Sequence, residues 1–241
     1  MLLSYPIQNI LFLDIETVPQ QPAYEQLGEE WKTLWEAKAN ILLRNREGET
    51  PESIYERAGI YAEFGKIVCI SCGVMQGVEN NRKLVIKSFA DDDEKQLLKN
   101  FTEMLIKWSC NEPRFLCAHN GKEFDFPYIC RRLIINGMPI PPLLNMVGKK
   151  PWEVNHLDTM ELWKFGDFKS FTSLNLLAHT LGIPTPKDDI DGSMVGDVYW
   201  KENDLSRIVT YCQKDVVTVA QIFLRLQGEE LLGSDSVEIK S

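Results

Sequence analysis

The stretch from Asn9 to Thr17, NILFLDIET, constrains the fold of this chain more than any other. Residues Ile10 to Leu13 form an apolar run that is too short for a lone helix and typical of a strand buried on both faces. Asp14 and Glu16 follow on alternate residues, and alternate residues of a strand point to the same face of a sheet. The sequence therefore predicts two carboxylates aimed at one point beside the end of a buried strand.

Two interpretations of this acid pair are open. Neighbouring carboxylates repel each other unless a proton or a cation lies between them, so Asp14 and Glu16 could form half of a divalent-metal site. Alternatively, the strand runs out into a solvated turn near Pro19. The spacing alone does not decide, because Asp92 and Glu94 repeat it where an amphipathic helix is expected to begin. Acids in the first turn of a helix offset the helix dipole and need no metal.

Length and composition bound the class of protein. At 241 residues and 44% hydrophobic content, the chain can bury a full core as one domain, or the cores of two small ones. No apolar run approaches the ~20 residues that cross a bilayer, and the amino terminus lacks the basic flank and long apolar segment of a secretory signal. We therefore expect a cytoplasmic protein. Its six cysteines then favour buried, reduced thiols, because the C-x-x-C pair Cys69 and Cys72 lies in a predicted strand, and no second pair completes a zinc site.

The formal net charge of −9 argues against a long, sequence-independent grip on duplex nucleic acid. It is compatible with an enzyme that holds a few nucleotides through metal ions and a local basic patch. Part of the excess of acids would then belong to the site itself.

The pattern along the chain predicts an α/β fold, with one domain over residues 1–230, a helical insert at about 20–64 and a frayed tail at 231–241. Two strands after the insert are expected to pair antiparallel with the first strand. The second half alternates strand and helix, which implies parallel pairing through crossover connections. The expected elements are strands at 66–74, 82–89, 114–118 and 155–159, and helices at 91–108, 126–136, 173–181 and 202–226.

The insert is unusually long for a connection between strands. Its apolar residues recur at helical spacing, and Thr50 and Pro51 predict the start of a second α-helix that runs to Tyr61. The insert either covers one flank of the sheet or has a role beside the site.

Two further acids lie far from the first pair. Asp125 follows the predicted strand at 114–118, in HNGKEFDFPY, and Asp215 lies four residues after Tyr211 in the last helix, in YCQKD. That spacing places the phenol and the carboxylate on one helical face. Asp125 could instead cap a helix, and Asp215 could be solvated with Tyr211 in the core. However, open α/β sheets bind ligands at the carboxyl ends of neighbouring strands, which is where Asp14 and Asp125 are expected.

Together these motifs resemble those of a known family. DIET, NGKEFDFPY and YCQKD are similar to the three exonuclease motifs of the DEDD superfamily of 3′–5′ exonucleases, in its tyrosine-bearing (DEDDy) branch. They are most similar to the proofreading exonuclease domain of family-B DNA polymerases, over roughly residues 9 to 227. Ser173-Leu174-Asn175 also resembles that domain. The resemblance implies a ribonuclease-H-like fold, with a mixed five-stranded sheet flanked by helices.

The resemblance also implies the site residues. Two divalent cations, Mg²⁺ or Mn²⁺, would be bound by four carboxylates, and all-oxygen ligands favour such hard ions over zinc. A tyrosine would lie near the attacking water, where it would orient the water by a hydrogen bond, since a phenol of ordinary pKa is a poor base. The metal ligands implied are Asp14, Glu16, Asp125 and Asp215, and the tyrosine is Tyr211.

Contacts with substrate are a further prediction. Asn120 and Phe124 lie where they could touch the terminal nucleotide, Phe171 could stack on a base, and Lys122 could bind phosphate. Packing or solvation explains each of them equally well. Other basic candidates are Lys149, Lys150, Lys164 and Lys169.

The function expected from the resemblance is a metal-dependent 3′–5′ exonuclease that removes nucleoside 5′-monophosphates from single-stranded or frayed DNA ends by a two-metal mechanism. It would act alone or take its context from a polymerase or another repair or replication partner. An exoribonuclease or a hydrolase of short oligonucleotides with the same fold is one alternative. A catalytically silent nucleic-acid-binding scaffold is another, and a protein that interacts through the 20–64 insert is a third.

Overall fold

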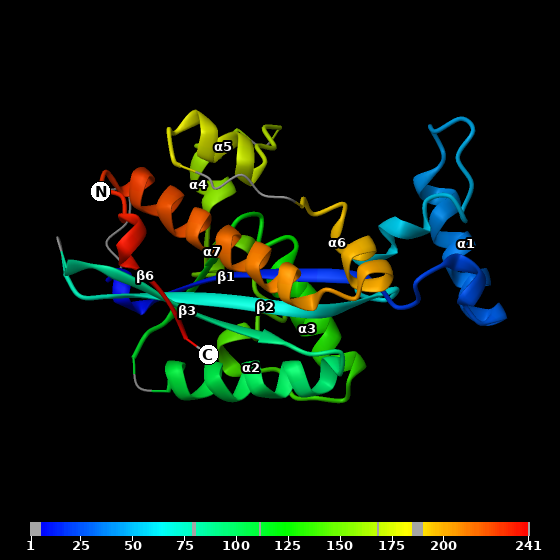
Figure 1. Cartoon of the computed structure of the whole chain (residues 1–241), viewed down its shortest axis with the longest axis horizontal. Coiled ribbons are helices and arrows are strands. Elements are labelled where there is room, and N and C mark those ends of the chain that lie inside the picture. Colours follow the sequence, from blue (N-terminus) through cyan, green and yellow to red (C-terminus); the bar gives the residue numbers. More distant parts are fainter. Residues whose placement is uncertain (1–5, 79–80, 111, 168, 185–189, 241) are drawn as a thin grey trace.

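Strand β1 (Ile10–Pro19) lies at the centre of the sheet. The computed structural model describes residues 6–78, 81–110, 112–167, 169–184 and 190–240. On one side β1 pairs antiparallel with β2 (Gly65–Gln76), and on the other it pairs parallel with β4 (Phe115–Ala118). The described strands form one mixed sheet in the order β5-β4-β1-β2-β3-β6 (Figure 1). The predicted mixed α/β architecture is confirmed, with six strands rather than five.

β1 extends past the two acids, where the sequence predicted that it would end. Asp14 lies opposite Ser71 and Glu16 lies opposite Cys69, and the ladder with β2 continues to Pro19 and Gly65. Because β2 supplies backbone partners along this whole length, the chain stays extended beyond the apolar run. The register shifts between Glu16 and Thr17, which marks a β-bulge directly after the second acid. The acid pair therefore lies inside a strand and not at its end.

The remaining strands extend the sheet on both sides, with β5 and β6 at its edges. β3 (Lys83–Ala90) pairs antiparallel with β2, and β5 (Leu157–Asp158) pairs parallel with β4. The sixth strand, β6 (Val237–Lys240), pairs parallel with β3. It comes from the segment that was expected to be a frayed tail. Val237 and Ile239 alternate there with charged residues, a period-two pattern that suits an edge strand.

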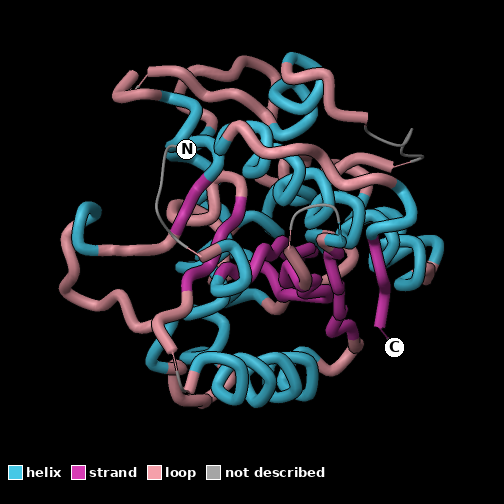
Figure 2. The backbone as a smooth tube through the Cα atoms, turned by 90° about the vertical axis from the view of Figure 1, so that its left-hand side faces the viewer, coloured by secondary structure: helices cyan, strands magenta, loops and turns pink. Residues whose placement is uncertain are grey.

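Alternation along β1 divides the molecule into two layers around the sheet. Leu11, Leu13 and Ile15 pack against α2 (Glu94–Ser109) and α3 (Asp125–Ile135) on one face. Ile10 and Phe12 pack on the other face against α7 (Leu205–Gln227), where the Phe12 and Phe223 ring centroids are 5.5 Å apart. Figure 1 shows α7 and α2 on opposite sides of the strands, and Figure 2 shows the same layers from the side. Asp14 and Glu16 continue the even-numbered face, so they lie under α7.

Shorter helices complete the α7 side. Ser173 caps α5 (Leu174–Thr180), and α5 packs on α7 through Leu177 and Ile222. The chain then passes through α6 (Val195–Asp197) and a π-helical turn, η7 (Val198–Glu202), before α7 begins. Within the described ranges, no helix combines the length and apolar content that a bilayer span requires.

The insert forms a structure of its own beyond one end of the sheet (Figure 1). It contains α1 (Glu29–Leu42) and a 3-10 helix, η3 (Tyr55–Ile60), packed around the fully buried Trp35. The α-helix predicted after Thr50 is wrong. Thr50 does cap a turn by accepting a hydrogen bond from the Ser53 N–H, but the chain then tightens into 3-10 geometry. That geometry brings Gly59 against β1, so close that an added Cβ would lie 3.0 Å from the Val18 carbonyl carbon.

Candidate metal centre

Asp14 and Glu16 meet a thiol from α7. The ligand atoms of Asp14, Glu16 and Cys212 all lie within 4.8 Å of one another. The Cys212 Sγ is 3.5 Å from the Asp14 Oδ2 and 3.4 Å from the Asp14 backbone oxygen. Asp14 and Glu16 also share a side-chain hydrogen bond, which requires a proton on one of the two carboxyls. The alternation predicted from DIET thus brings both acids to one point.

Asp125 lies next to Asp14 and Glu16 on the side of β1 that faces β4. It is the first residue of α3, is 3% exposed, and its carboxylate accepts a hydrogen bond from the Ile15 N–H. β4 pairs with β1 only as far as Phe12, so this N–H lies beyond the part of the edge that β4 covers. Asp125 therefore binds the backbone between Asp14 and Glu16, and it does not serve as the N-cap, which is Phe124.

Asp215 and Tyr211 complete the group from α7. The Tyr211 hydroxyl donates a hydrogen bond to the Asp215 carboxylate one helical turn away, as the spacing predicted. The negative charge of Asp215 acts on Asp14, Glu16 and Asp125 alike. The structure therefore brings together all four predicted acids and the tyrosine, from β1, α3 and α7. Their roles in binding and catalysis stay predictions.

The four-acid cluster (Asp14, Glu16, Asp125 and Asp215) holds more negative charge than its surroundings stabilise. Burial raises the pKa of Asp14 and of Glu16 well above the usual range, and the neighbouring carboxylates raise both further. Burial, with Asp158 and Asp215, raises the pKa of Asp125 to about 7. Clustered carboxylates of this kind are the oxygen donors that hard divalent cations prefer, and a bound cation would remove the repulsion. The residues present fit such an ion.

Tyr211 is held in its neutral form. Burial, followed by the charges of Asp215, Glu16 and Asp14, raises the pKa of its phenol above the ordinary value. A protonated phenol can donate a hydrogen bond but cannot accept a proton as a base. The residue also lies under the loop before α6, because a Cβ added to Gly192 would be 4.0 Å from the Tyr211 oxygen.

A chain of partly and fully buried polar side chains leads from Gln213 to the thiol that contacts Asp14. Gln213 donates to the Ser88 hydroxyl at 2.9 Å, and the Ser88 and Ser71 hydroxyls are 2.8 Å apart. Ser71 lies 3.7 Å from the Cys69 sulfur, and Cys69 hydrogen-bonds to Cys212. The sequence predicted that these cysteines are buried, reduced thiols, without a link to the acids. The missed signal is the spacing of Cys212 and Asp215, which at three residues apart share a face of the last helix.

Asp158 is a second residue that sequence reasoning missed. It is 2% exposed and is the N-cap of α4 (Thr159–Lys164), where its Oδ1 accepts the Met160 N–H at 2.9 Å. The same carboxylate accepts the Asn120 N–H at 2.9 Å and the Lys122 N–H at 3.1 Å. Asn120 has a left-handed backbone, with φ of 62°. Asp158 therefore fixes the turn that leads into Asp125.

The predicted substrate contacts have different surroundings. Phe124 is partly buried, and its ring centroid is 5.4 Å from that of Tyr128. Phe171 is 67% exposed, with the Lys164 ammonium 4.3 Å from its ring centroid. The Lys122 ammonium pairs with Glu161 at 2.8 Å, so its charge is already partly neutralised. Contact of these residues and Asn120 with substrate stays a prediction.

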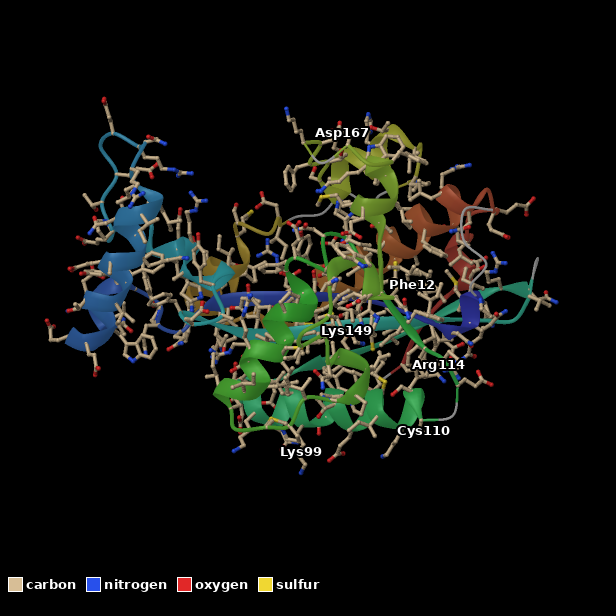
Figure 3. All side chains as sticks on the ribbon, turned by 180° about the vertical axis from the view of Figure 1, so that it is seen from behind. Phe12, Lys99, Cys110, Arg114, Lys149 and Asp167 are labelled. Carbon is tan, nitrogen blue, oxygen red and sulfur yellow. The ribbon has the colours of Figure 1, made fainter. Side chains whose placement is uncertain are left out.

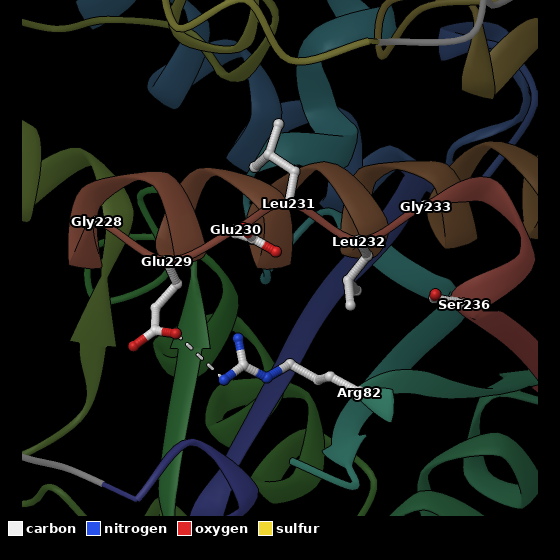
Figure 4. Close-up of a pocket in the computed structure, with 8 residues that line it drawn as sticks. All are labelled: Arg82, Gly228, Glu229, Glu230, Leu231, Leu232, Gly233 and Ser236. Atoms are coloured by element: carbon white, nitrogen blue, oxygen red, sulfur yellow. Dashed lines mark hydrogen bonds and ion pairs between the residues drawn. The ribbon is translucent and has the colours of Figure 1, made fainter. Parts of the chain in front are cut away.

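A separate pocket of about 530 Å³ follows the carboxyl end of α7 (Figure 4). Arg82 and the segment from Gly228 to Gly233 line it, and Arg82 pairs with Glu229 at 3.3 Å. None of the four acids or Tyr211 lines this pocket. It therefore adds nothing to the metal centre.

Comparisons with known proteins identify the family of the chain. A family model described as a predicted 3′–5′ exonuclease related to the exonuclease domain of PolB matches residues 60–233. The matched range includes Asp125, Tyr211 and Asp215 but begins after β1 and its two acids. No curated protein matches the sequence.

Among solved structures, the family B DNA polymerase from the hyperthermophilic archaeon Pyrobaculum calidifontis is similar, with a TM-score of 0.54 and 15% sequence identity. The match covers 91% of this chain but 25% of the polymerase chain, so this chain spans about a quarter of that protein's length. At this identity the likeness concerns the fold, which is the ribonuclease-H-like fold of a PolB exonuclease domain. The chain therefore belongs to the family of predicted 3′–5′ exonucleases related to the exonuclease domain of PolB.

Proposed function

We propose that this protein is a metal-dependent 3′–5′ exonuclease that acts on single-stranded or frayed DNA ends. The observation that carries the proposal is the convergence of four carboxylates from β1, α3 and α7. The ligand atoms of Asp14 and Glu16 lie within 4.8 Å of each other, Asp125 binds the Ile15 N–H between them, and the charge of Asp215 acts on all three. Such an arrangement is unfavourable unless a proton or a cation neutralises it, and a bound cation can neutralise several carboxylates at once. The assignment to a PolB-related exonuclease family supports the same reading.

The four acids are the proposed ligands of two divalent cations, Mg²⁺ or Mn²⁺. Carboxylate oxygens suit these ions, and Glu16 and Asp125 are buried enough for their orientation to be set by the fold. When bound, a pair of such ions activates water and neutralises both the phosphate and the leaving oxygen of a phosphodiester. The protein contributes the position of the carboxylates, which the β1 ladder, the Ile15 N–H and α7 hold from three directions.

Tyr211 is the proposed water-positioning residue. Its hydroxyl is held by Asp215 at the edge of the acid cluster, and its raised pKa keeps it protonated. It would therefore hold the attacking water by hydrogen bonding and would not remove its proton.

Phe171 and Lys164 are the proposed contacts for the single strand near the site. An exposed aromatic ring can stack on any base, and the lysine beside it can contact phosphate. His119 connects this loop to the turn before Asp125, because its Nε2 lies 2.8 Å from the Thr172 carbonyl oxygen and its Nδ1 lies 2.9 Å from the Thr159 hydroxyl. These hydrogen bonds of His119 would hold the loop that carries Phe171, and any base stacked on it, in a fixed position relative to the turn before Asp125. We choose DNA over RNA as the substrate only because of the likeness to PolB. We also propose that a polymerase, or another replication or repair protein, delivers the 3′ end of the DNA to this site.

Trimming of a 5′-labelled oligonucleotide tests the function. Wild type should release nucleoside 5′-monophosphates in Mg²⁺ or Mn²⁺ and none in EDTA, and Asp14→Ala and Asp215→Asn should abolish release while remaining folded by circular dichroism. Asp197→Asn is the matched control, since Asp197 is an exposed acid paired with Lys201. Undiminished trimming by the site variants would refute the proposal.

The same assay separates the alternatives. Faster trimming of RNA or of very short strands would replace the DNA assignment with an exoribonuclease or an oligonucleotide hydrolase. Absence of trimming together with absence of Mn²⁺ binding by calorimetry would indicate a silent scaffold.

A further inference from the structure

A thiol lies in direct contact with the carboxylates of β1. Cys212 is fully buried, its Sγ is 3.5 Å from the Asp14 Oδ2, and the ligand atoms of Asp14, Glu16 and Cys212 lie within 4.8 Å of one another. The sulfur adds a donor of different chemistry to one side of the acid cluster.

A second thiol lies behind the first. Cys69 is opposite Glu16 in the β1–β2 ladder, is fully buried, and hydrogen-bonds to Cys212. The ladder and α7 therefore bring two sulfurs and two carboxylates to one buried place, from residues that are far apart in the sequence.

The donor atoms of this group, sulfur and carboxylate oxygen, predict which metal ions it would bind. Sulfur donors favour soft or borderline cations such as Cd²⁺ and Zn²⁺, whereas Mg²⁺ and Mn²⁺ prefer oxygen alone. Around a tetrahedral ion with metal–sulfur and metal–oxygen lengths of about 2.3 and 2.1 Å, neighbouring donor atoms lie roughly 3.5 Å apart. The distance between the Cys212 Sγ and the Asp14 Oδ2 is 3.5 Å, which has that value. The ligand atoms of all three residues lie within 4.8 Å of one another, so small side-chain movements would bring them to the spacing that a bound ion requires.

We propose that Asp14, Glu16 and Cys212 form a binding site for one thiophilic divalent cation of the Cd²⁺ and Zn²⁺ class. On binding, the thiol proton of Cys212 is released to solvent, and Cys69 supports the sulfur from behind. The site uses the two carboxylates that the proposed function assigns to Mg²⁺ or Mn²⁺. A thiophilic cation bound there would occupy these carboxylates and inhibit trimming. That inhibition rests on the proposed function, whereas the binding itself does not.

A titration with Cd²⁺ alone tests binding without any nucleic acid. Added to the metal-free full chain, Cd²⁺ should produce an ultraviolet sulfur-to-cadmium charge-transfer band that saturates at a single equivalent. Cys212→Ser should lose the band. Cys110→Ser is the matched control and should keep it, because Cys110 is an exposed thiol that follows α2 on the surface (Figure 3). Glu16→Gln should keep the band but weaken Cd²⁺ binding by at least about tenfold.

The outcomes are decisive in each case. No band in wild type, or an equal band in folded Cys212→Ser, would overturn the inference. Should Cys212→Ser unfold by circular dichroism, Glu16→Gln decides, and unchanged Cd²⁺ affinity in that variant would also overturn it. A band in a protein that trims no oligonucleotide would remove the proposed function alone. Trimming without a band would remove only the thiophilic site.

Discussion

Replacing Asp125 by asparagine should stabilise the metal-free protein at alkaline pH. Asp125 is buried, and burial together with Asp158 and Asp215 makes its negative charge unfavourable in the folded state. Asparagine has the same shape, and its amide oxygen can still accept the hydrogen bond from the Ile15 N–H. The substitution therefore removes the repelled charge while keeping the main contact. Loss of a proposed metal ligand should abolish trimming at the same time.

The size and the pH window follow from the pKa of the carboxyl. Folding raises it from 3.8 to about 7. At about 1.4 kcal/mol per unit, the ionised carboxylate lowers the free energy of unfolding by at most about 4 kcal/mol. For an acid whose pKa is raised on folding, the unfolded state binds fewer protons between the two values, so stability falls as the pH rises through this range. The cost is absent below about pH 4 and complete above about pH 7.

Urea unfolding of wild type and Asp125→Asn in EDTA, at pH 5 and pH 8, measures this effect. The advantage of the variant should grow by about 2 to 3 kcal/mol between the two pH values, and Mn²⁺ should stabilise wild type and narrow the gap. The exposed control Asp197→Asn should show no such growth. An Asp125→Asn protein that is no more stable than wild type at pH 8, or a gap that does not depend on pH, would refute the reasoning.

Three other variants probe the site and its support. Tyr211→Phe should lower kcat by less than about 100-fold with KM nearly unchanged, measured on a labelled oligonucleotide, because the phenol holds water and does not take its proton. Phe171→Ala should weaken binding of single-stranded DNA by about 5- to 150-fold in fluorescence anisotropy at fixed salt, the cost of one lost stack. Glu94→Ala should lower the free energy of unfolding by about 3 to 5 kcal/mol, because it leaves the buried Arg132 without the carboxylate that binds its Nε at 2.8 Å. Unchanged kcat, unchanged DNA affinity or unchanged urea stability, respectively, would contradict these roles.

Residue spacing in the sequence predicted those parts of the site that lie within a single strand or a single helix. The period of two in DIET places Asp14 and Glu16 together, and the period of 3.6 in YCQKD places Tyr211 beside Asp215. Both relations depend on backbone geometry alone, so they survive any change in packing. The convergence of these segments with Asp125 is a tertiary property. The position of ligand sites at the carboxyl ends of neighbouring strands indicated that Asp125 lies near Asp14, and the resemblance of three ordered motifs to a family indicated the complete group.

The features that sequence reasoning missed depend on partners distant along the chain. β1 continues past Glu16 because β2 offers a ladder as far as Gly65, and nothing within NILFLDIET encodes that partner. The sequence places Asp158 in a predicted strand at 155–159, whereas its carboxylate caps α4 and also binds the Asn120 and Lys122 amides of another loop. Cys212 appears as a core residue until Asp14 is seen beside it. In each case the partner that decides the outcome lies outside the local segment.

The insert shows how a long interruption can lie next to a site without disturbing it. The chain leaves the sheet after Pro19 and returns at Gly65, which are partners in the ladder, and the Gln20 N–H donates to the Phe64 carbonyl at 2.9 Å. The insert is thus closed at its base like a long hairpin connection. Closure costs only about 0.6 kcal/mol more for each doubling of loop length, so the added length weakens the β1–β2 pairing very little.

The two halves of the insert nevertheless differ in their relation to the metal centre. The first half carries α1, whose buried residues pack within the insert's own cluster. The second half binds α3, because the Tyr128 hydroxyl donates to the Gly59 carbonyl at 2.7 Å and Arg132 donates to the Ala62 carbonyl at 2.8 Å. Since α3 begins with Asp125, the returning segment braces the helix that carries a proposed ligand. The position of that ligand therefore depends on the segment between Gly59 and Gly65, and α1 has no comparable hold on it.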